Sequence, residues 1–388
     1  MPSQSHGRAC LLVALCLITV FFIAKPSRDG FQFGFRRGRS TGHGISNSTL
    51  GFQRILVISA PWRTDRKDSL TLAASHTGLG LEWIPGVNAS DINEKAFPPG
   101  NWRAIPRGNV GSWRAHMDAL RIVVERNLST ALIMEDDVDW SFTVRKQLMD
   151  FAVASQHLPG MIEQAESKKE VHVPATEDTN QKKALDLEEQ ARRSTLPLPS
   201  SPRSPASPDD PYGRAHDILW LGHCGTSLPP SSRSPNRLLL PSDPSVPSPQ
   251  NLKASHTAPL DAISSLYPPH TRVYHRTSRT LCTLAYAVTQ RGARKMLYEH
   301  GIRNFDKGYD FALSEWCDGE TRNMGERPVC LTSSPPVFSH FWPGDGEAGG
   351  GKSDIMGVGA GGVERESAYL VGSVRGGYAG AVEVGIEV

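Results

Sequence analysis

Short apolar segments that stop abruptly at polar residues set the strongest limit on how this chain can fold. The clearest are residues 54–59, Arg-Ile-Leu-Val-Ile-Ser, and residues 131–134, Ala-Leu-Ile-Met. Runs of this length and composition are typical of buried strands in a parallel sheet covered on both faces. Residues 111–126 instead carry apolar side chains at helical spacing. The alternation predicts an α/β domain, with further strands near 81–87, 217–222 and 283–288 and further helices near 66–77, 142–154 and 292–300.

The run 131–134 ends at four carboxylates within five residues: Glu135, Asp136, Asp137 and Asp139. In open α/β sheets, ligands gather beyond the carboxyl ends of the strands. Carboxylates crowded there repel one another, and a hard cation such as Mg²⁺ or Mn²⁺ relieves that repulsion and can bind the diphosphate of an activated substrate. A solvated acidic turn is the alternative. The apolar lead-in favours the metal site.

The charge balance argues against a nucleic-acid partner. The 388 residues contain 42 Lys and Arg and 40 Asp and Glu, which gives a formal net charge of +2. Nucleic-acid binding usually requires a concentrated basic face. We therefore expect no nucleic-acid partner.

One medium-sized domain, 51–356, is expected to contain the folded core. Two segments within it, about 158–210 and 227–260, are low-complexity stretches rich in Pro and Ser, the first also strongly charged. Such segments cannot bury enough apolar surface to become ordered, so we predict disordered insertions. A stem rich in Gly, Arg and Ser is expected at 26–50, and a flexible Gly-rich tail at 357–388.

The N-terminal segment 9–24 is apolar and free of charge. As a helix it would span about 24 Å at ~1.5 Å per residue, short for a bilayer core of about 30 Å unless Arg8 and Lys25 snorkel. A cleaved signal peptide is the alternative, but residues 22–24 offer no small-x-small cleavage site. We expect an uncleaved signal anchor over 1–25.

The orientation signals of this segment disagree. Arg8 alone precedes it, whereas Lys25 and several arginines follow, and positive-inside counting then places the rest of the chain in the cytoplasm. Asn-x-Ser/Thr triplets at Asn47, Asn88 and Asn127 favour a lumenal domain.

The cysteines support an oxidising compartment. Outside the apolar segment there are four, an even set that permits two disulfides: Cys224, Cys282, Cys317 and Cys330. Zinc is the alternative, but no Cys-x-x-Cys spacing appears. We expect a single-pass type II protein of the Golgi or endoplasmic reticulum membrane, with its catalytic domain in the lumen.

Several motifs occur in a fixed order along the chain. They are Arg-Thr-Asp-Arg at 63–66, Gly-Ser-Trp-Arg-Ala-His at 111–116, the acidic motif at 131–140, Leu-Trp-Leu-Gly-His-Cys-Gly at 219–225, the segment 282–288 followed by Gly292-Ala293, Tyr-Asp-Phe-Ala-Leu at 309–313, and Gly-Lys-Ser-Asp-Ile at 351–355. Together they resemble glycosyltransferase family 25, which contains lipooligosaccharide and collagen β-galactosyltransferases, and above all its fungal branch. The resemblance covers about 53–355, interrupted by the two insertions.

The resemblance implies a GT-A type fold, in which helices flank a nucleotide-sugar-binding sheet. It also implies a nucleotide-sugar donor, typically UDP-galactose, a divalent metal (Mn²⁺ or Mg²⁺), a glycan or glycoprotein acceptor, and inversion at the anomeric carbon. Asp137 and Asp139 would hold the metal, which neutralises the UDP leaving group. Glu135, Asp136 and Asp137 offer a second register for the same task, and Glu135 can instead orient a neighbour.

Three further residues are expected at the donor. Arg63 and Arg66 follow the first strand and match positions that contact nucleotide or phosphate; pairing with nearby aspartates is the alternative. His116 matches a family position that usually follows Ser, whereas Ala115 precedes it here. A hydrogen-bonded structural role is the alternative for this histidine.

Inverting transfer needs a base that takes the proton of the acceptor hydroxyl. Asp310 occupies the acidic position that the resemblance implies, and Asp306, one helical turn away, is the alternative. Either carboxylate can instead serve only a helix dipole. The chain departs from its fungal relatives at His216, where they tend to have Trp, so acceptor choice stays open.

Two other functions compete with the membrane-anchored transferase. A catalytically silent family member would bind a sugar nucleotide or a partner protein in the lumen. A phosphoesterase with two metals would need further His or Asp ligands at short fixed spacing, and the sequence shows none.

Overall fold

The computed structural model describes residues 44–167, 189, 191–201, 210–230, 234–249, 252, 266–321, 325–341 and 370–377. All of them belong to one compact unit, Gly42–Val388. The predicted signal anchor and most of the stem lie outside the described residues. Among the helices that are described, none has the length and apolar character needed to cross a membrane.

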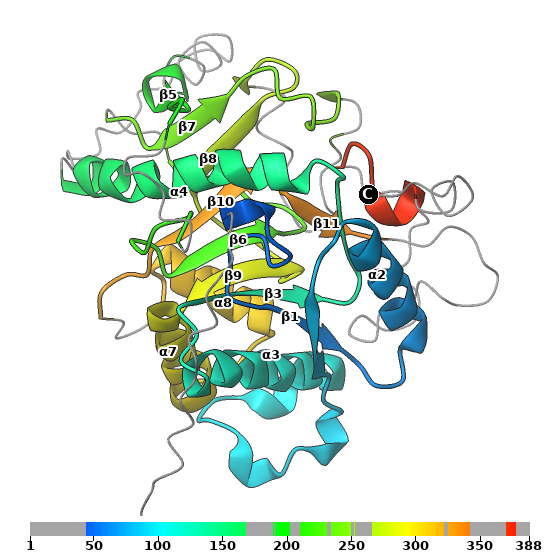
Figure 1. Ribbon diagram of the computed structural model, residues 1–388. Helices are drawn as coiled ribbons and strands as arrows, with labels where there is room; N and C mark the ends of the chain where they lie inside the picture. Colours follow the sequence, from blue (N-terminus) through cyan, green and yellow to red (C-terminus); the bar gives the residue numbers. More distant parts are fainter. Residues whose placement is uncertain are drawn as a thin grey trace, which may run out of the picture. The chain divides into compact units, whose positions relative to one another are not determined.

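A mixed sheet forms the centre of the described part of the chain (Figure 1). Its main path runs in the order β2-β1-β3-β9-β6-β10-β8-β7-β5, and β11 joins β4 to β6. The strands are β1 Ile55–Ser59, β2 Leu81–Pro85, β3 Thr130–Glu135, β4 Val138–Trp140, β5 Thr195–Pro197, β6 Ile218–Gly222, β7 Arg237–Leu240, β8 Arg272–Arg276, β9 Ala285–Thr289, β10 Cys330–Ser334 and β11 Phe338–His340.

Only part of this sheet is parallel, whereas the sequence suggested a parallel sheet. β1 pairs in parallel with β2 and β3, and β6 pairs in parallel with β10. β9 lies antiparallel between β3 and β6. It is nevertheless buried at every position, as β1 is. An unbroken apolar run indicates that both faces of a strand are buried. Here this is true of parallel and antiparallel strands alike, so the run does not reveal the strand direction.

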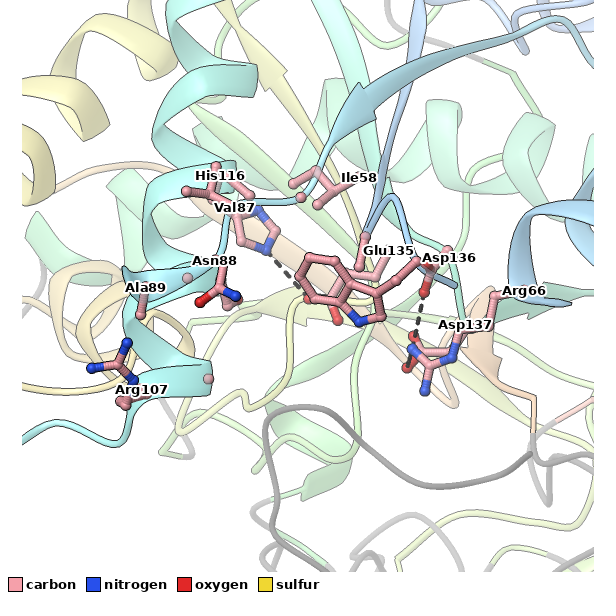
Figure 2. Close-up of a pocket in the computed structure, with 17 residues that line it drawn as sticks. Ile58, Arg66, Val87, Asn88, Ala89, Arg107, His116, Glu135, Asp136 and Asp137 are labelled. Atoms are coloured by element: carbon pink, nitrogen blue, oxygen red, sulfur yellow. Dashed lines mark hydrogen bonds and ion pairs between the residues drawn. The ribbon is translucent and has the colours of Figure 1, made fainter. Parts of the chain in front are cut away.

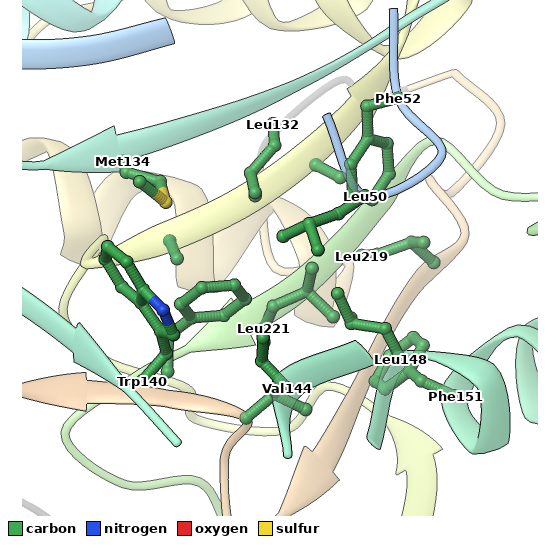
Figure 3. Close-up of a cluster of buried hydrophobic side chains, with 14 of the residues drawn as sticks. Leu50, Phe52, Leu132, Met134, Trp140, Val144, Leu148, Phe151, Leu219 and Leu221 are labelled. Carbon is green, nitrogen blue, oxygen red and sulfur yellow. The ribbon is translucent and has the colours of Figure 1, made fainter. Parts of the chain in front are cut away.

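Helices cover both faces of the sheet (Figure 1). Alternate residues of β1 enter different cores: Ile55 and Val57 one, Leu56 and Ile58 the other. The first core packs against α4 (Figure 3), and the second against α3, α7 and α8. The helices are α2 Thr64–His76, α3 Arg107–Glu125, α4 Val144–Ser167, α7 Gln290–Tyr298 and α8 Tyr309–Asp318, with short turns η1 Gly44–Ser46, η2 Ala89–Asp91, η3 Glu94–Ala96, η4 Trp102–Ala104 and η6 Glu299–Arg303.

Both segments predicted to be disordered insertions contain packed elements, so for those residues the prediction is wrong. α4 continues to Ser167, because Leu158 and Ile162 extend its buried stripe past Pro159. β7 lies within the second segment and pairs with β8 and β5. The Pro and Ser content of these stretches hid short apolar patterns that bury against the first core.

Two disulfides link the four cysteines predicted to pair. Cys224 bonds to Cys282, and Cys317 bonds to Cys330. The first bridge ties the end of β6 to the loop before β9. The second ties α8 to β10.

Candidate functional site

A cleft of about 330 Å³ opens at the carboxyl ends of β1, β2 and β3. These three strands are parallel neighbours, so the loops that follow them meet at one edge of the sheet, where α/β proteins usually bind ligands. α3 forms the opposite wall. Figure 2 shows Ile58, Asn88, His116 and Glu135 converging on this space.

Gly111 allows α3 to lie close to the loop after β2. A Cβ atom at this position would be 2.3 Å from the carbonyl oxygen of Val87. Any side chain would therefore push the helix away and change the width of the cleft. This contact explains the glycine that begins the motif at 111–116.

The acidic motif forms the floor of the cleft. Arg66 Nη1 donates to Asp136 Oδ1 at 2.9 Å and to Asp137 Oδ2 at 2.9 Å (Figure 2). Burial, together with the charge of Asp137, raises the pKa of Asp136. Burial also opposes ionisation of Asp137, but the positive charges of Arg66 and Arg375 lower its pKa, with a further contribution from the nearby His340. Of these two carboxylates, Asp137 is the one whose ionised form the surroundings favour.

Asp137 has an oxygen that suits a cation. Its Oδ1 is buried and accepts no hydrogen bond from the residues that the structure describes, which is costly for a carboxylate oxygen. Among the described residues, no group of three His, Cys, Asp or Glu side chains gathers to hold a metal ion. Mg²⁺ in phosphate-transfer sites commonly needs only one or two carboxylates, since the substrate's phosphates and water complete its shell. Asp136 and Asp137 fit such a shared ion.

Asp139 lies behind the cleft, in β4, and does not line it. The carboxylate is 1% exposed. Its Oδ1 accepts from Trp140 N at 2.7 Å and Arg375 N at 3.2 Å, and its Oδ2 accepts from the Ser373 hydroxyl. Burial raises its pKa despite these bonds. Of the two predicted registers, the one formed by residues 135–137 faces the cleft.

The two predicted donor arginines are in different surroundings. Arg66 lines the cleft. Arg63 does not, and instead makes a two-pronged ion pair with Asp65, with Nε to Oδ1 at 2.9 Å and Nη2 to Oδ2 at 2.7 Å. This is the pairing that the sequence offered as the alternative for Arg63.

His116 belongs to a buried chain of hydrogen bonds that ends at Glu135. Its Nε2 lies 3.3 Å from Glu135 Oε1, and its Nδ1 lies 3.1 Å from the Tyr286 hydroxyl. That hydroxyl is 3.2 Å from the hydroxyl of Tyr309. Burial raises the pKa of both tyrosines, so they stay protonated. Thr283 Oγ1 donates to Glu135 Oε1 at 2.6 Å. Glu135 is thereby held in a fixed direction.

Asp310 lies in the first turn of α8, next to Tyr309 of this network. Its Oδ1 accepts from Phe311 N at 2.9 Å, and its Oδ2 accepts from Cys282 N at 3.3 Å. Burial raises its pKa, and the negative charge of Glu135 adds to the rise. Asp310 and Glu135 are thus connected through the consecutive residues Cys282 and Thr283.

Asp306 has no comparable setting. Its side chain is 38% exposed, 3.9 Å from Lys307 Nζ. The structure therefore distinguishes the two candidate bases by burial and by contact with the loop before β9.

Sequence reasoning assigned no role to several residues of the site. Trp62, 54% exposed, and Asn88 and Arg107 line the cleft. Asn88 attracted notice only as a glycosylation triplet, although its side chain accepts from Ser90 N and so begins η2. Its position just after the predicted second strand was the signal that could have identified it.

Comparisons with known proteins agree with this geometry. Residues 52–305 match the model of glycosyltransferase family 25 (LPS biosynthesis protein), which is more than half of the chain. Human procollagen galactosyltransferase 2 is 24% identical over 112 residues, 26% of this chain and 18% of the relative. Human inactive glycosyltransferase 25 family member 3 is 26% identical over 113 residues, 26% of this chain and 19% of the relative. A Drosophila melanogaster glycosyltransferase 25 family member is 25% identical over 103 residues, 24% of this chain and 17% of the relative.

The chain thus spans less than a fifth of the length of each of these relatives. The match to the family model is much longer than these alignments, and it includes β1, β3, α3 and the acidic motif. This chain belongs to glycosyltransferase family 25.

Proposed function

We propose that the chain is a metal-dependent, inverting glycosyltransferase that moves a hexose, galactose by preference, from a UDP-sugar to a hydroxyl of a glycan or glycoprotein. The observation that carries the proposal is the buried, unpartnered Oδ1 of Asp137 in a cleft at the carboxyl ends of parallel strands. The preference for galactose rests on the name of the relative, procollagen galactosyltransferase 2.

Different residues of the cleft would contact different parts of the donor. Asp136 and Asp137 would hold Mn²⁺ or Mg²⁺ at the diphosphate end, where the ion would neutralise the charge of the departing UDP. Arg66 and Arg107 supply positive charge there, and a guanidinium suits phosphate oxygens as well as carboxylates. Trp62 offers an exposed aromatic ring against which the nucleotide base of the donor can stack.

Asp310 would act as the base on the acceptor side. Its raised pKa keeps the carboxylate basic enough to accept a proton from the acceptor hydroxyl. Glu135, which lines the cleft and is oriented by Thr283 and His116, is the rival for this role.

The decisive experiment is transfer by the full chain across a panel of nucleotide sugars, with and without Mn²⁺. We expect UDP release and transfer with UDP-galactose, dependence on the metal, and an inverted anomeric product by NMR. Transfer that is unchanged by a chelator would contradict the metal-dependent mechanism, and a retained anomer would contradict the inverting one.

A second candidate is a silent family member that binds a sugar nucleotide without turning it over. Arg66 already forms ion pairs with both Asp136 and Asp137, and one relative of comparable identity is named as inactive. Calorimetry with UDP-galactose separates the two: binding without hydrolysis or transfer to any acceptor would favour the silent protein.

We also propose that residues 1–25 anchor the protein in the Golgi or endoplasmic reticulum membrane with the domain in the lumen. The two disulfides support this placement, since they require an oxidising compartment. Protease protection of the domain in sealed microsomes, together with a mobility shift after endoglycosidase treatment, is the expected result.

A further inference from the structure

Residues 370–377, which lie beyond the part matched by the family model, pack against the turn that carries the acidic motif. Ser141 Oγ donates to Val371 O at 2.6 Å, and Phe142 N donates to Gly372 O at 3.1 Å. Ser141 and Ser373 also form an antiparallel bridge. Part of the tail predicted to be flexible is therefore attached next to β4.

Arg375 connects this segment to the backbone of the acidic motif. The residue is 5% exposed. Its Nη1 donates to the carbonyl oxygens of Asp136 at 3.0 Å and Val138 at 2.9 Å. Its Nε donates to Ser69 Oγ at 3.2 Å, and the guanidinium lies 4.2 Å from the centre of the Phe341 ring.

These two carbonyl groups flank Asp137. A single nitrogen atom that binds both of them fixes the turn of the backbone at the residue between them, and so the direction of its side chain. The same guanidinium places a buried positive charge near Asp137, in addition to that of Arg66. Groups that hold a metal ligand in place typically contribute 10- to 100-fold to metal affinity or activity.

We propose that Arg375 is a positioning residue that holds Asp137 in the direction needed to bind a divalent cation together with the donor's diphosphate. The inference rests on the proposed function, since it assumes that a cation binds at Asp136 and Asp137. Arg375 itself does not line the cleft. Its effect on the site passes through the backbone of the acidic turn.

The test measures Mn²⁺ binding to the full chain by electron paramagnetic resonance, with and without UDP. Arg375→Ala should weaken Mn²⁺ binding by roughly 10- to 100-fold, and Arg375→Lys, which keeps the charge and one donor group, should recover part of the loss. Arg145→Ala is the matched control. Arg145 also donates to two backbone carbonyls, Thr77 O at 2.9 Å and Asn47 O at 3.4 Å, away from the cleft. We expect its Mn²⁺ affinity to match that of the unmodified chain at a similar loss of melting temperature.

Ser373→Ala provides a milder perturbation should Arg375→Ala fail to fold. It removes the hydroxyl that donates to Asp139 Oδ2 and accepts from Gly376 N at 2.8 Å, and should weaken Mn²⁺ binding in the same direction. If Arg375→Ala folds and its Mn²⁺ affinity is unchanged, the inference is overturned but the proposed function is not. If Arg375→Ala does not fold, unchanged Mn²⁺ affinity in Ser373→Ala has the same consequence. Equal weakening of Mn²⁺ binding in Arg145→Ala would also overturn the inference alone. An unmodified chain that binds no Mn²⁺ even with UDP would overturn the proposed function and the inference with it.

Discussion

Replacing Asp310 by Asn should abolish most transfer while leaving the fold and donor binding intact. The amide keeps the shape of the side chain and can still accept one of the two bonds, from Phe311 N or from Cys282 N. The lost bond costs about 1 kcal/mol, offset in part because a buried carboxylate no longer has to ionise. Loss of a general base lowers the rate by roughly 10²–10⁴, or about 2.7–5.5 kcal/mol at ~1.36 kcal/mol per factor of ten.

The pH dependence gives this prediction a second readout. Burial and Glu135 raise the pKa of Asp310, so the carboxylate holds its proton to a higher pH than an ordinary aspartate. Transfer should therefore fall as the pH drops through this raised pKa, and the Asn variant should lose that limb of the profile. Stability depends on pH in the opposite direction. The unmodified chain loses stability as the pH rises from the ordinary aspartate pKa through the raised one, because ionising this group is unfavourable in the folded protein. The Asn variant escapes this loss, so its stability relative to the unmodified chain increases over the same pH range.

Steady-state kinetics with a UDP-sugar and acceptor, alongside calorimetry with UDP, measure both effects. Asp306→Asn is the control, because that carboxylate is exposed and lies 3.9 Å from the side chain of its neighbour Lys307. The reasoning is refuted if Asp306 proves the sensitive position, or if Asp310→Asn loses UDP binding in proportion to its activity. A severe loss in Glu135→Gln combined with a mild one in Asp310→Asn would transfer the role of base to Glu135.

Three further predictions test the donor site and the fold. Asp137→Asn should abolish Mn²⁺-dependent transfer and UDP binding together, because among the carboxylates of the cleft Asp137 alone has a buried oxygen that lacks a hydrogen bond from the described residues; wild-type activity at low Mn²⁺ would contradict this. Gly111→Ala places a methyl group against the Val87 carbonyl and should cost about 1–3 kcal/mol by overpacking, with a raised donor KM; an unchanged unfolding midpoint would show that α3 shifts freely. Deleting 168–188, whose composition is charged and poor in apolar residues, should leave the melting temperature nearly unchanged, whereas Leu158→Ala in the buried stripe of α4 should cost about 2–5 kcal/mol; denaturation curves measure both.

The sequence predicted best where one physical signal dominates. Unbroken apolar runs located β1 and β3 within a residue of their observed bounds, because burial on both faces leaves no room for polar side chains. The rule that ligands gather at carboxyl ends of strands then placed Asp136 at the cleft, whereas the role of Arg66 was inferred from the family resemblance. Asp136 is the first residue after β3, so its position follows directly from that of the strand.

The orientation of Asp139 and the packing of 370–377 were beyond this reasoning. Counting acidic residues treats Glu135 to Asp139 as one cluster. However, β4 begins at Val138, and the side chains of a strand point alternately to its two faces. Val138 and Trp140 enter the first core, so Asp139 between them must point to the other side, where Ser373 and Arg375 bind it. A Gly-rich tail carries no periodic signal, and its attachment depends on polar contacts that only the folded turn creates.

The loop before β9 links Asp310, the proposed base, to Glu135 at the cleft. Cys282 donates its backbone N–H to Asp310, and the next residue, Thr283, donates its hydroxyl to Glu135. Only one peptide unit therefore separates the group proposed to take the proton from the group at the edge of the donor cleft. Cys282 is held at a φ of 64° and is covalently bonded to Cys224 at the end of β6. The loop cannot slide along α8 without breaking that disulfide, so the sheet sets the spacing between Asp310 and Glu135.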